Sequence, residues 1–140
     1  MGNCNFLINL EHNMKILQSL VITTLLISVT SLSEATILKA SFYKSGKQTA
    51  SGEIFSATKS TAASNKYKFG TIIQLSYEGK TTKVCVNDTG AFVKYGRDLD
   101  VSSKVARTLG FEKKGVVSLD SKVIYKPKKR TSCKEAWGLV

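Results

Sequence analysis

The chain has 140 residues, 42% of them hydrophobic, which is enough for one folded domain and too little for a second core. Its 21 lysine and arginine residues outnumber 10 acidic residues, and the net charge of +11 favours a polyanionic partner. With one histidine and three cysteines, the sequence has neither a histidine-rich nor a paired CxxC zinc motif. Composition therefore excludes most classes of metalloenzyme, and we expect no metal site and no cofactor.

A short apolar run follows Lys15 near the start of the chain. A positive residue before such a run, with small residues at Ser33 and Ala35 after it, is typical of a secretory signal peptide. We therefore predict a signal peptide over residues 14–35, preceded by a non-native upstream extension over residues 1–13, and export to the periplasm, the cell envelope or the medium. A membrane anchor is the alternative, but it needs about 20 apolar residues, so we expect no stable membrane span after processing.

The remaining chain, a domain over residues 36–126 and a basic tail over residues 127–140, carries two cysteines. Cys85 and Cys133 are an even pair in a chain expected to be exported, which makes them a candidate disulfide. Two free thiols are the alternative, because sequence alone does not give their separation in space. We interpret the basic run Lys128–Arg130 as solvent-exposed, with attraction to an anionic polymer as its functional alternative.

In chain order, the first predicted element of this domain is a strand over residues 37–43, ended by a Ser-Gly turn. Two segments rich in glycine and serine or in small polar residues follow, residues 49–55 and 60–65. We interpret both as ordered loops, the second with at most one helical turn. β-Branched runs over residues 71–77 and 80–87 then flank a two-residue Glu-Gly turn, which is the spacing of a β-hairpin.

After the hairpin, an Asp-Thr-Gly break and an irregular stretch lead to a helical pattern. Apolar residues recur every four positions before Gly110, so we predict a short helix over residues 102–109. Residues 116–125 supply one or two further strands. Many short strands with one small helix in about 100 residues predict an all-β fold in the form of a small barrel.

Six short segments share their order and spacing with one known family. They are Ala40–Tyr43, Thr49–Phe55, Thr61–Ala63, Phe69–Thr71, Val86–Phe92 and Asp100–Ser102. Together they resemble the double-psi β-barrel domain of the rare lipoprotein A family, whose catalytic members are lytic transglycosylases of peptidoglycan and to which expansins are distantly related. The resemblance covers residues 39–125 and implies a six-stranded double-psi β-barrel.

The resemblance also implies roles for individual residues. The Asp associated with catalysis in this family falls on Asp88, and a family Glu falls on Glu53, so both are candidate catalytic residues. The family's usual His is replaced by Ser64, whose hydroxyl forms hydrogen bonds but carries no charge. The candidate substrate-binding residues are Tyr43, Thr49, Ser64, Asn87, Phe92 and Asp100.

Each candidate also has a plainer structural interpretation. Asp88 suits a turn in which its carboxylate accepts backbone N–H bonds, and Asp100 suits the start of the predicted helix. Glu53 is alternatively an exposed loop acid. The rings of Tyr43 and Phe92 suit core packing as well as stacking on sugar rings.

Lytic cleavage of a glycosidic bond needs only one carboxyl group. The C6 hydroxyl of the sugar attacks the anomeric carbon, and the same carboxyl acts first as acid and then as base. Asp88 would therefore suffice once its pKa is raised from about 3.9 by burial or by a neighbouring carboxylate such as Glu53 or Asp100.

We thus expect an exported, monomeric lytic transglycosylase that cleaves the bond between N-acetylmuramic acid (MurNAc) and N-acetylglucosamine (GlcNAc) and leaves 1,6-anhydro-MurNAc ends. Its expected partner is the glycan strand of peptidoglycan. The alternatives are a non-catalytic glycan-binding module of the same fold, which the missing His favours, and a secreted protein that inhibits another protein. Nucleic acid is not an expected partner, because the chain has no recognisable nucleic-acid motif.

Overall fold

The computed structural model describes residues 13–15 and 34–140. The predicted upstream extension and signal peptide therefore lie almost wholly outside the described residues. Every strand in the described part belongs to the unit Ser33–Val140. None of the helices in the described residues is both long and apolar enough to cross a membrane.

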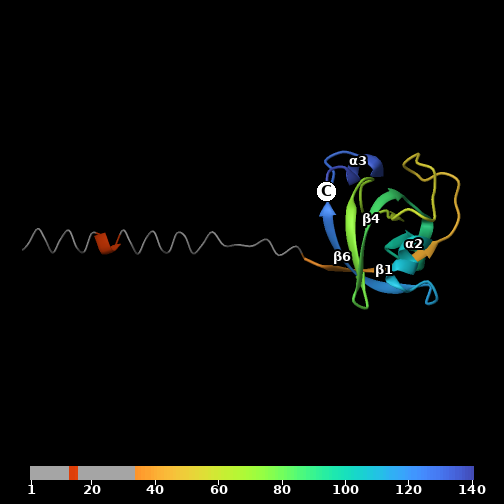
Figure 1. The fold of residues 1–140 in the computed structure, drawn as a ribbon, viewed down its shortest axis with the longest axis horizontal. Helices are drawn as coiled ribbons and strands as arrows, with labels where there is room; N and C mark the ends of the chain where they lie inside the picture. Colours follow the sequence, from red (N-terminus) through yellow and green to blue (C-terminus); the bar gives the residue numbers. More distant parts are fainter. Residues whose placement is uncertain (1–12, 16–33) are drawn as a thin grey trace, which may run out of the picture. The chain divides into compact units, whose positions relative to one another are not determined.

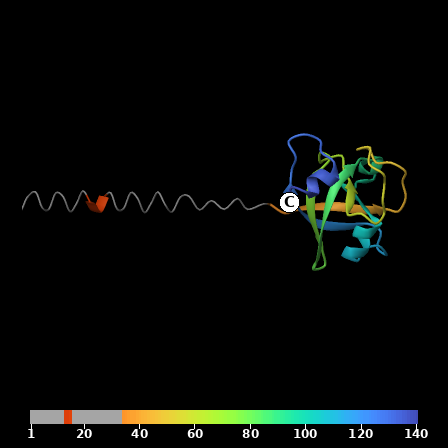
Figure 2. The same ribbon diagram turned by 45° about the horizontal axis from the view of Figure 1, so that its top comes forward.

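The unit is built on a closed β-barrel with small helices outside it (Figures 1 and 2). Its strands are β1 Thr36–Tyr43, β2 Thr61–Ala63, β3 Ile72–Tyr77, β4 Lys80–Asp88, β5 Leu99–Ser102 and β6 Val117–Tyr125. Its helices are the 3-10 helix η1 Ala91–Tyr95 and the α-helices α2 Ser103–Leu109 and α3 Cys133–Trp137. The strands follow the order β1-β5-β2-β4-β3-β6 around the barrel, with β1·β5 and β2·β4 parallel and the other neighbours antiparallel. The predicted all-β, six-stranded barrel is confirmed.

The predicted hairpin and helix are also confirmed. Strands β3 and β4 pair as far as Tyr77 and Lys80, and the turn residues Glu78 and Gly79 have φ angles of 45° and 79°. Positive φ at both positions is the backbone of a type I′ turn, whose twist matches that of the flanking strands. Helix α2 ends at Gly110, whose φ of 84° places it in the left-handed region that glycine adopts at low cost.

Two strands were not expected from the sequence. The prediction of at most one helical turn within residues 60–65 is wrong, because β2 lies there, and β5 lies in the stretch predicted to be irregular. Both strands are short and buried almost throughout, so their side chains show no alternation of polar and apolar residues. Their partners are distant along the chain, since Thr61 lies opposite Cys85 and Ala62 lies opposite Val101.

The barrel encloses a core of aliphatic side chains to which every strand contributes. The buried strand residues include Leu38, Ala40, Ala62, Ile73, Leu75, Val84, Val86, Leu99, Val101 and Leu119. Helix α2 adds Val105 and Leu109 to this core. Phe111 packs edge-on against Phe42 and Tyr77, with ring centres 6.2 and 6.0 Å away. Because such interiors are densely packed, the strand ends that carry the site residues are held in fixed positions.

The predicted basic tail contains a helix, α3, that packs against the barrel. A disulfide joins Cys133 at the start of α3 to Cys85 in β4, with the two Cα atoms 5.8 Å apart. Cys85, Cys133, Ile72 and Ala136 are buried together in a second apolar cluster. The run Lys128–Arg130 before the helix is exposed. The C-terminal residues are thus attached covalently to the barrel wall.

Candidate active site

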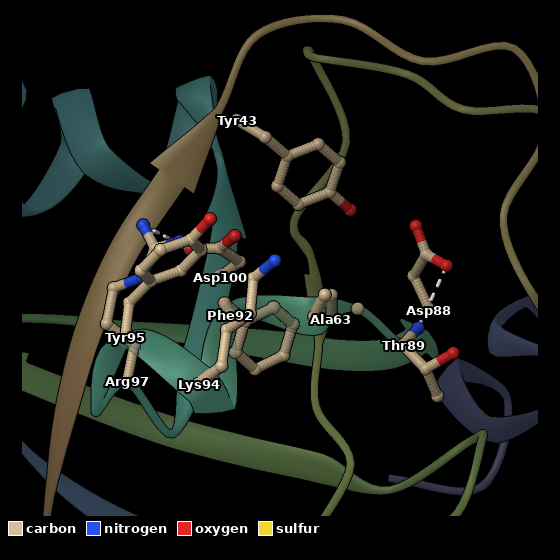
Figure 3. Close-up of a pocket in the computed structure, with 11 residues that line it drawn as sticks. Tyr43, Ala63, Asp88, Thr89, Phe92, Lys94, Tyr95, Arg97 and Asp100 are labelled. Carbon is tan, nitrogen blue, oxygen red and sulfur yellow. Dashed lines mark hydrogen bonds and ion pairs between the residues drawn. The ribbon is translucent and has the colours of Figure 1, made fainter.

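A pocket of about 350 Å³ lies where β1 and β4 end, beside η1 and β5. We call it the Asp88 pocket, and its lining residues are Tyr43, Ala63, Asp88, Thr89, Gly90, Ala91, Phe92, Lys94, Tyr95, Arg97 and Asp100. Figure 3 shows Asp88 on one side of the pocket and Arg97 and Asp100 on the other, with Ala63 and Phe92 between them. Four of the candidate site residues therefore meet here, namely Tyr43, Asp88, Phe92 and Asp100.

Asp88 is the last residue of β4, and the main chain holds its carboxylate. Oδ1 accepts hydrogen bonds from the backbone N–H groups of Ala50 and Thr89, each 2.8 Å long. Ala50 lies in the loop of residues 44–60 that joins β1 to β2, so this bond ties the loop to the barrel. Among the described residues, no donor bonds to Oδ2. The turn interpretation of Asp88 thus accounts for one oxygen and leaves the other for a ligand.

Tyr43 is the last residue of β1, and its hydroxyl points toward the Asp88 side of the pocket (Figure 3). The hydroxyl oxygen is buried and has no hydrogen-bond partner of good geometry among the described residues. Burial, followed by the negative charge of Asp88, raises the pKa of Tyr43 to about 12. The hydroxyl therefore stays protonated at neutral pH and is a neutral donor directed into the pocket.

On the opposite side of the pocket, Asp100, Arg97 and Ser41 form a polar network. The Ser41 hydroxyl donates to Asp100 Oδ1, and Arg97 Nη1 donates to Ser41 Oγ and lies 3.6 Å from Asp100 Oδ1. Burial raises the pKa of the Asp100 carboxyl, and the Arg97 guanidinium opposes that shift. Asp100 is therefore engaged by side chains of the pocket wall. Across residues 13–15 and 34–140, no three His, Cys, Asp or Glu side chains are grouped so as to hold a metal ion.

Three lining residues, Lys94, Tyr95 and Arg97, were missed by the sequence analysis. The cations of Lys94 and Arg97 lie 5.0 and 5.6 Å from the centre of the Tyr95 ring, which is 64% exposed. These residues fall between two of the segments that carry the family resemblance. Two cations flanking an aromatic residue in the stretch that follows Asp88 were the available sequence signal for this polar wall of the pocket.

Glu53, a candidate catalytic residue, lies outside the Asp88 pocket. Its Oε2 accepts a hydrogen bond from Asn87 Nδ2, and its Oε1 accepts one from the backbone N–H of Cys133, both 2.8 Å long. The carboxylate thus braces the 44–60 loop against β4 and α3. This role was hidden in the sequence, because Cys133 lies 80 residues away.

Three candidate substrate-binding residues, Thr49, Asn87 and Ser64, are buried and do not line the Asp88 pocket. The Thr49 hydroxyl donates to the Glu53 carbonyl, and the Asn87 amide donates to the Glu53 carboxylate. The Ser64 hydroxyl donates to the Asp98 carbonyl at 3.3 Å. All three side chains therefore support the loops around the pocket.

Comparison with known protein families identifies the family to which this chain is related. The profile of the family described as lytic transglycolase matches residues 35–120, which is more than half of the sequence. The chain belongs to this family. Its double-psi β-barrel accounts for the closed six-stranded sheet, and the matched range includes every residue that lines the Asp88 pocket. Helix α3 lies beyond the matched range.

Curated relatives in the lytic transglycolase family are considerably longer than this chain. A probable endolytic peptidoglycan transglycosylase RlpA from Nostoc sp. is 36% identical over 92 residues, which cover 61% of this chain and 24% of that protein. The protein of the same name from Treponema pallidum is 39% identical over 82 residues, which cover 55% and 26%. The chain thus spans about a quarter of the length of these relatives.

Solved structures with the same fold are more distant in sequence. The Streptomyces papain inhibitor superposes with a TM-score of 0.56 at 20% identity, covering 68% of this chain and 98% of the inhibitor. A mutant expansin of Clavibacter michiganensis in complex with cellohexaose gives a TM-score of 0.53 at 18% identity, covering 70% of this chain and 54% of the expansin. These likenesses support the barrel fold.

Proposed function

We propose that this protein is an exported lytic transglycosylase that cleaves the MurNAc–GlcNAc bond of peptidoglycan glycan strands. The observation that supports this most directly is the Asp88 carboxylate at the wall of a pocket, which is fixed through Oδ1 and whose Oδ2 accepts no hydrogen bond from the described part of the chain. The relatives named as peptidoglycan transglycosylases support the same substrate class.

The proposed reaction requires Asp88 with a proton on its carboxyl group. Asp88 donates this proton to the glycosidic oxygen as the bond from that oxygen to C1 of MurNAc breaks, so the departing GlcNAc carries a hydroxyl group. The C6 hydroxyl oxygen of the same MurNAc bonds to C1, and its proton returns to Asp88. No water is consumed, so no second carboxylate is required to activate it. Glu53 is therefore free to serve as a brace.

The other pocket residues supply contacts to the sugar in this proposal. The neutral Tyr43 hydroxyl donates a hydrogen bond to a sugar oxygen near Asp88. Lys94 and Arg97 attract the lactyl carboxylate that MurNAc carries where its stem peptide is absent, and the exposed face of Tyr95 stacks on a sugar ring.

The test is the substitution Asp88→Asn. The amide keeps an oxygen that accepts the Ala50 and Thr89 N–H bonds, but it has no acidic proton to give to the leaving group. We expect the rate of anhydro-muropeptide release from purified peptidoglycan sacculi, measured by mass spectrometry, to fall by about a hundredfold or more.

Asp120→Asn is the matched control for this change, because Asp120 is an exposed β6 residue that does not line the pocket. It should keep the wild-type rate. Retention of more than about a tenth of the activity by a folded Asp88→Asn protein would exclude Asp88 as the general acid.

A non-catalytic glycan-binding module is the second candidate function. Its support is Ser64, which stands where the family usually has His and which is fully buried with its hydroxyl bonded to the Asp98 carbonyl. Ser64 therefore supplies no titratable group to assist Asp88. Wild-type protein that binds sacculi and releases no anhydro product between about pH 4 and pH 8 would establish this second function.

A further inference from the structure

A second pocket, of about 730 Å³, is bounded by three segments. They are the 44–60 loop, the first turn of α2, and helix α3. We call this pocket the lysine groove and define it by Ile54, Lys59, Lys104, Lys134 and Trp137, which line it. It shares no lining residue with the Asp88 pocket, and the reaction proposed above does not use it.

The groove carries an unbalanced positive charge. Lys59, Lys104 and Lys134 are exposed, and none of them forms an ion pair within the part of the chain that the structure describes. The one carboxylate in the lining is Glu53, and both of its oxygens already accept hydrogen bonds, from Asn87 and from the Cys133 N–H. Three ammonium groups around one hollow favour a ligand with several carboxylates.

The groove also has apolar surface suited to a sugar. Trp137 is 36% exposed and Ile54 is 80% exposed, and both line the groove. The flat face of an indole ring packs well against the C–H face of a pyranose, whereas a bare inorganic anion gains nothing from it. Charge and apolar surface together point to a carboxylated saccharide.

The helix that forms one wall of the groove is held firmly. The Cys85–Cys133 disulfide attaches α3 to β4, and Glu53 binds the backbone N–H of Cys133. Because α3 lies outside the family-matched residues 35–120, this wall is a feature of this chain that the family match does not cover.

We propose that the lysine groove is a second binding site for peptide-free glycan strands of peptidoglycan. In such strands every MurNAc carries a free carboxylate, so sugar faces and negative charges recur along one chain. Naming this source rests on the function proposed above. Strand β2 connects the two sites, since Thr61 lines the groove and Ala63 lines the Asp88 pocket, roughly 7 Å apart along a strand. A single glycan strand is long enough to reach both.

Trp137 provides the reporter for the test, because it is the only tryptophan in the sequence. Its fluorescence is followed while the protein, with Asp88→Asn in every sample so that the strands are not cleaved, is titrated with three ligands. Peptide-free glycan strands carry sugars and carboxylates, chitohexaose carries sugars without carboxylates, and hexaglutamate carries carboxylates without sugars. We expect the strands to change the fluorescence and to bind at least about tenfold more tightly than either of the other two ligands.

The variant for this test is the triple substitution Lys59→Ala, Lys104→Ala and Lys134→Ala. It should weaken strand binding by about tenfold or more, because three charge contacts are lost together. The matched control is a second triple variant that removes the same charge from exposed residues outside the groove. Its substitutions are Lys83→Ala, Lys113→Ala and Lys122→Ala. It should bind strands as the wild type does.

Equal binding of strands by the lysine-groove variant and by the control would overturn the inference. Chitohexaose binding as tightly as the strands would overturn the role of the carboxylates, and equally tight hexaglutamate binding would identify the site as one for acidic peptides. Anhydro-product release by the wild type tests the proposed function separately. If the wild type releases no anhydro product but the strands bind in a lysine-dependent way, the proposed enzymatic function is refuted and the binding site in the groove is supported.

Discussion

The hydroxyl group of Tyr43 has an environment that lowers the stability of the fold but suits the binding of a ligand. This hydroxyl is buried with no hydrogen bond of good geometry among the described residues, although the Thr61 side chain lies near enough to lower its pKa slightly, and it points toward the side of the pocket where Asp88 lies (Figure 3). A buried polar group without a partner costs stability, about 1–3 kcal/mol in typical cases. Such a cost is understandable where a ligand supplies the missing partner.

Tyr43→Phe should therefore separate activity from stability. Removing the hydroxyl deletes one hydrogen bond to substrate, so we expect anhydro-product formation to fall about 3- to 10-fold. The melting temperature should stay the same or rise, because an unsatisfied buried group is removed. Rates on sacculi and thermal unfolding curves measure both effects. Reduced activity with a clearly lowered melting temperature would show instead that the hydroxyl has a structural role.

At the scale of single residues, the sequence predicted the residues that line the pocket better than it predicted the side chains that support its loops. Asp88, Tyr43, Phe92 and Asp100 line one pocket, as expected for a shared site, because each belongs to a segment with a family resemblance. Glu53 belongs to such a segment too, but its partners are a neighbouring strand and a distant helix. Residue type cannot distinguish a structural carboxylate from the proposed proton donor when both are half-buried.

Among the elements, α3 depends most on a single covalent bond. It is five residues long, and helices of that length are not stable in isolation. Its attachment consists of the Cys85–Cys133 disulfide, the Glu53 hydrogen bond and a small apolar cluster.

The double variant Cys85→Ala, Cys133→Ala should therefore lose stability. A disulfide that closes 48 residues of chain contributes about 4 kcal/mol by restricting the unfolded state. We expect urea unfolding to report a loss of that order, and amide exchange in α3 to accelerate more than exchange in β4. A reducing agent should lower the stability of the wild type and leave the double variant unchanged. An undiminished free energy of unfolding would mean that the apolar cluster alone secures the helix.

The elements predicted from sequence were those with a local signal. The β3–β4 hairpin is joined by a two-residue turn that demands positive φ, and α2 has an apolar repeat and a terminal glycine. Strands β2 and β5 lack such signals. Their side chains are buried on both faces, and their register depends on β4 and β1 or on each other. Only the closed barrel supplies the reason for their conformation.

For the whole molecule, the net charge of +11 governs encounters with an anionic polymer. If attraction to sacculi is mainly electrostatic, raising the salt concentration from about 0.05 M to about 0.5 M shortens the Debye length about threefold and should release most of the bound protein. A pelleting assay with sacculi measures the bound fraction. Binding that is unchanged by salt would assign the affinity to sugar stacking in the pockets.

The two pockets draw on different stretches of the chain. The Asp88 pocket takes all of its lining residues from Tyr43 to Asp100, whereas the lysine groove needs Lys134 and Trp137 near the C-terminus. Substitutions in α3 therefore alter the lining of the lysine groove and leave the lining of the Asp88 pocket unchanged. Under the two proposed functions, natural selection can change the affinity of the groove for a glycan strand without changing the catalytic pocket, and a lineage can gain or lose the groove while it keeps the barrel and Asp88.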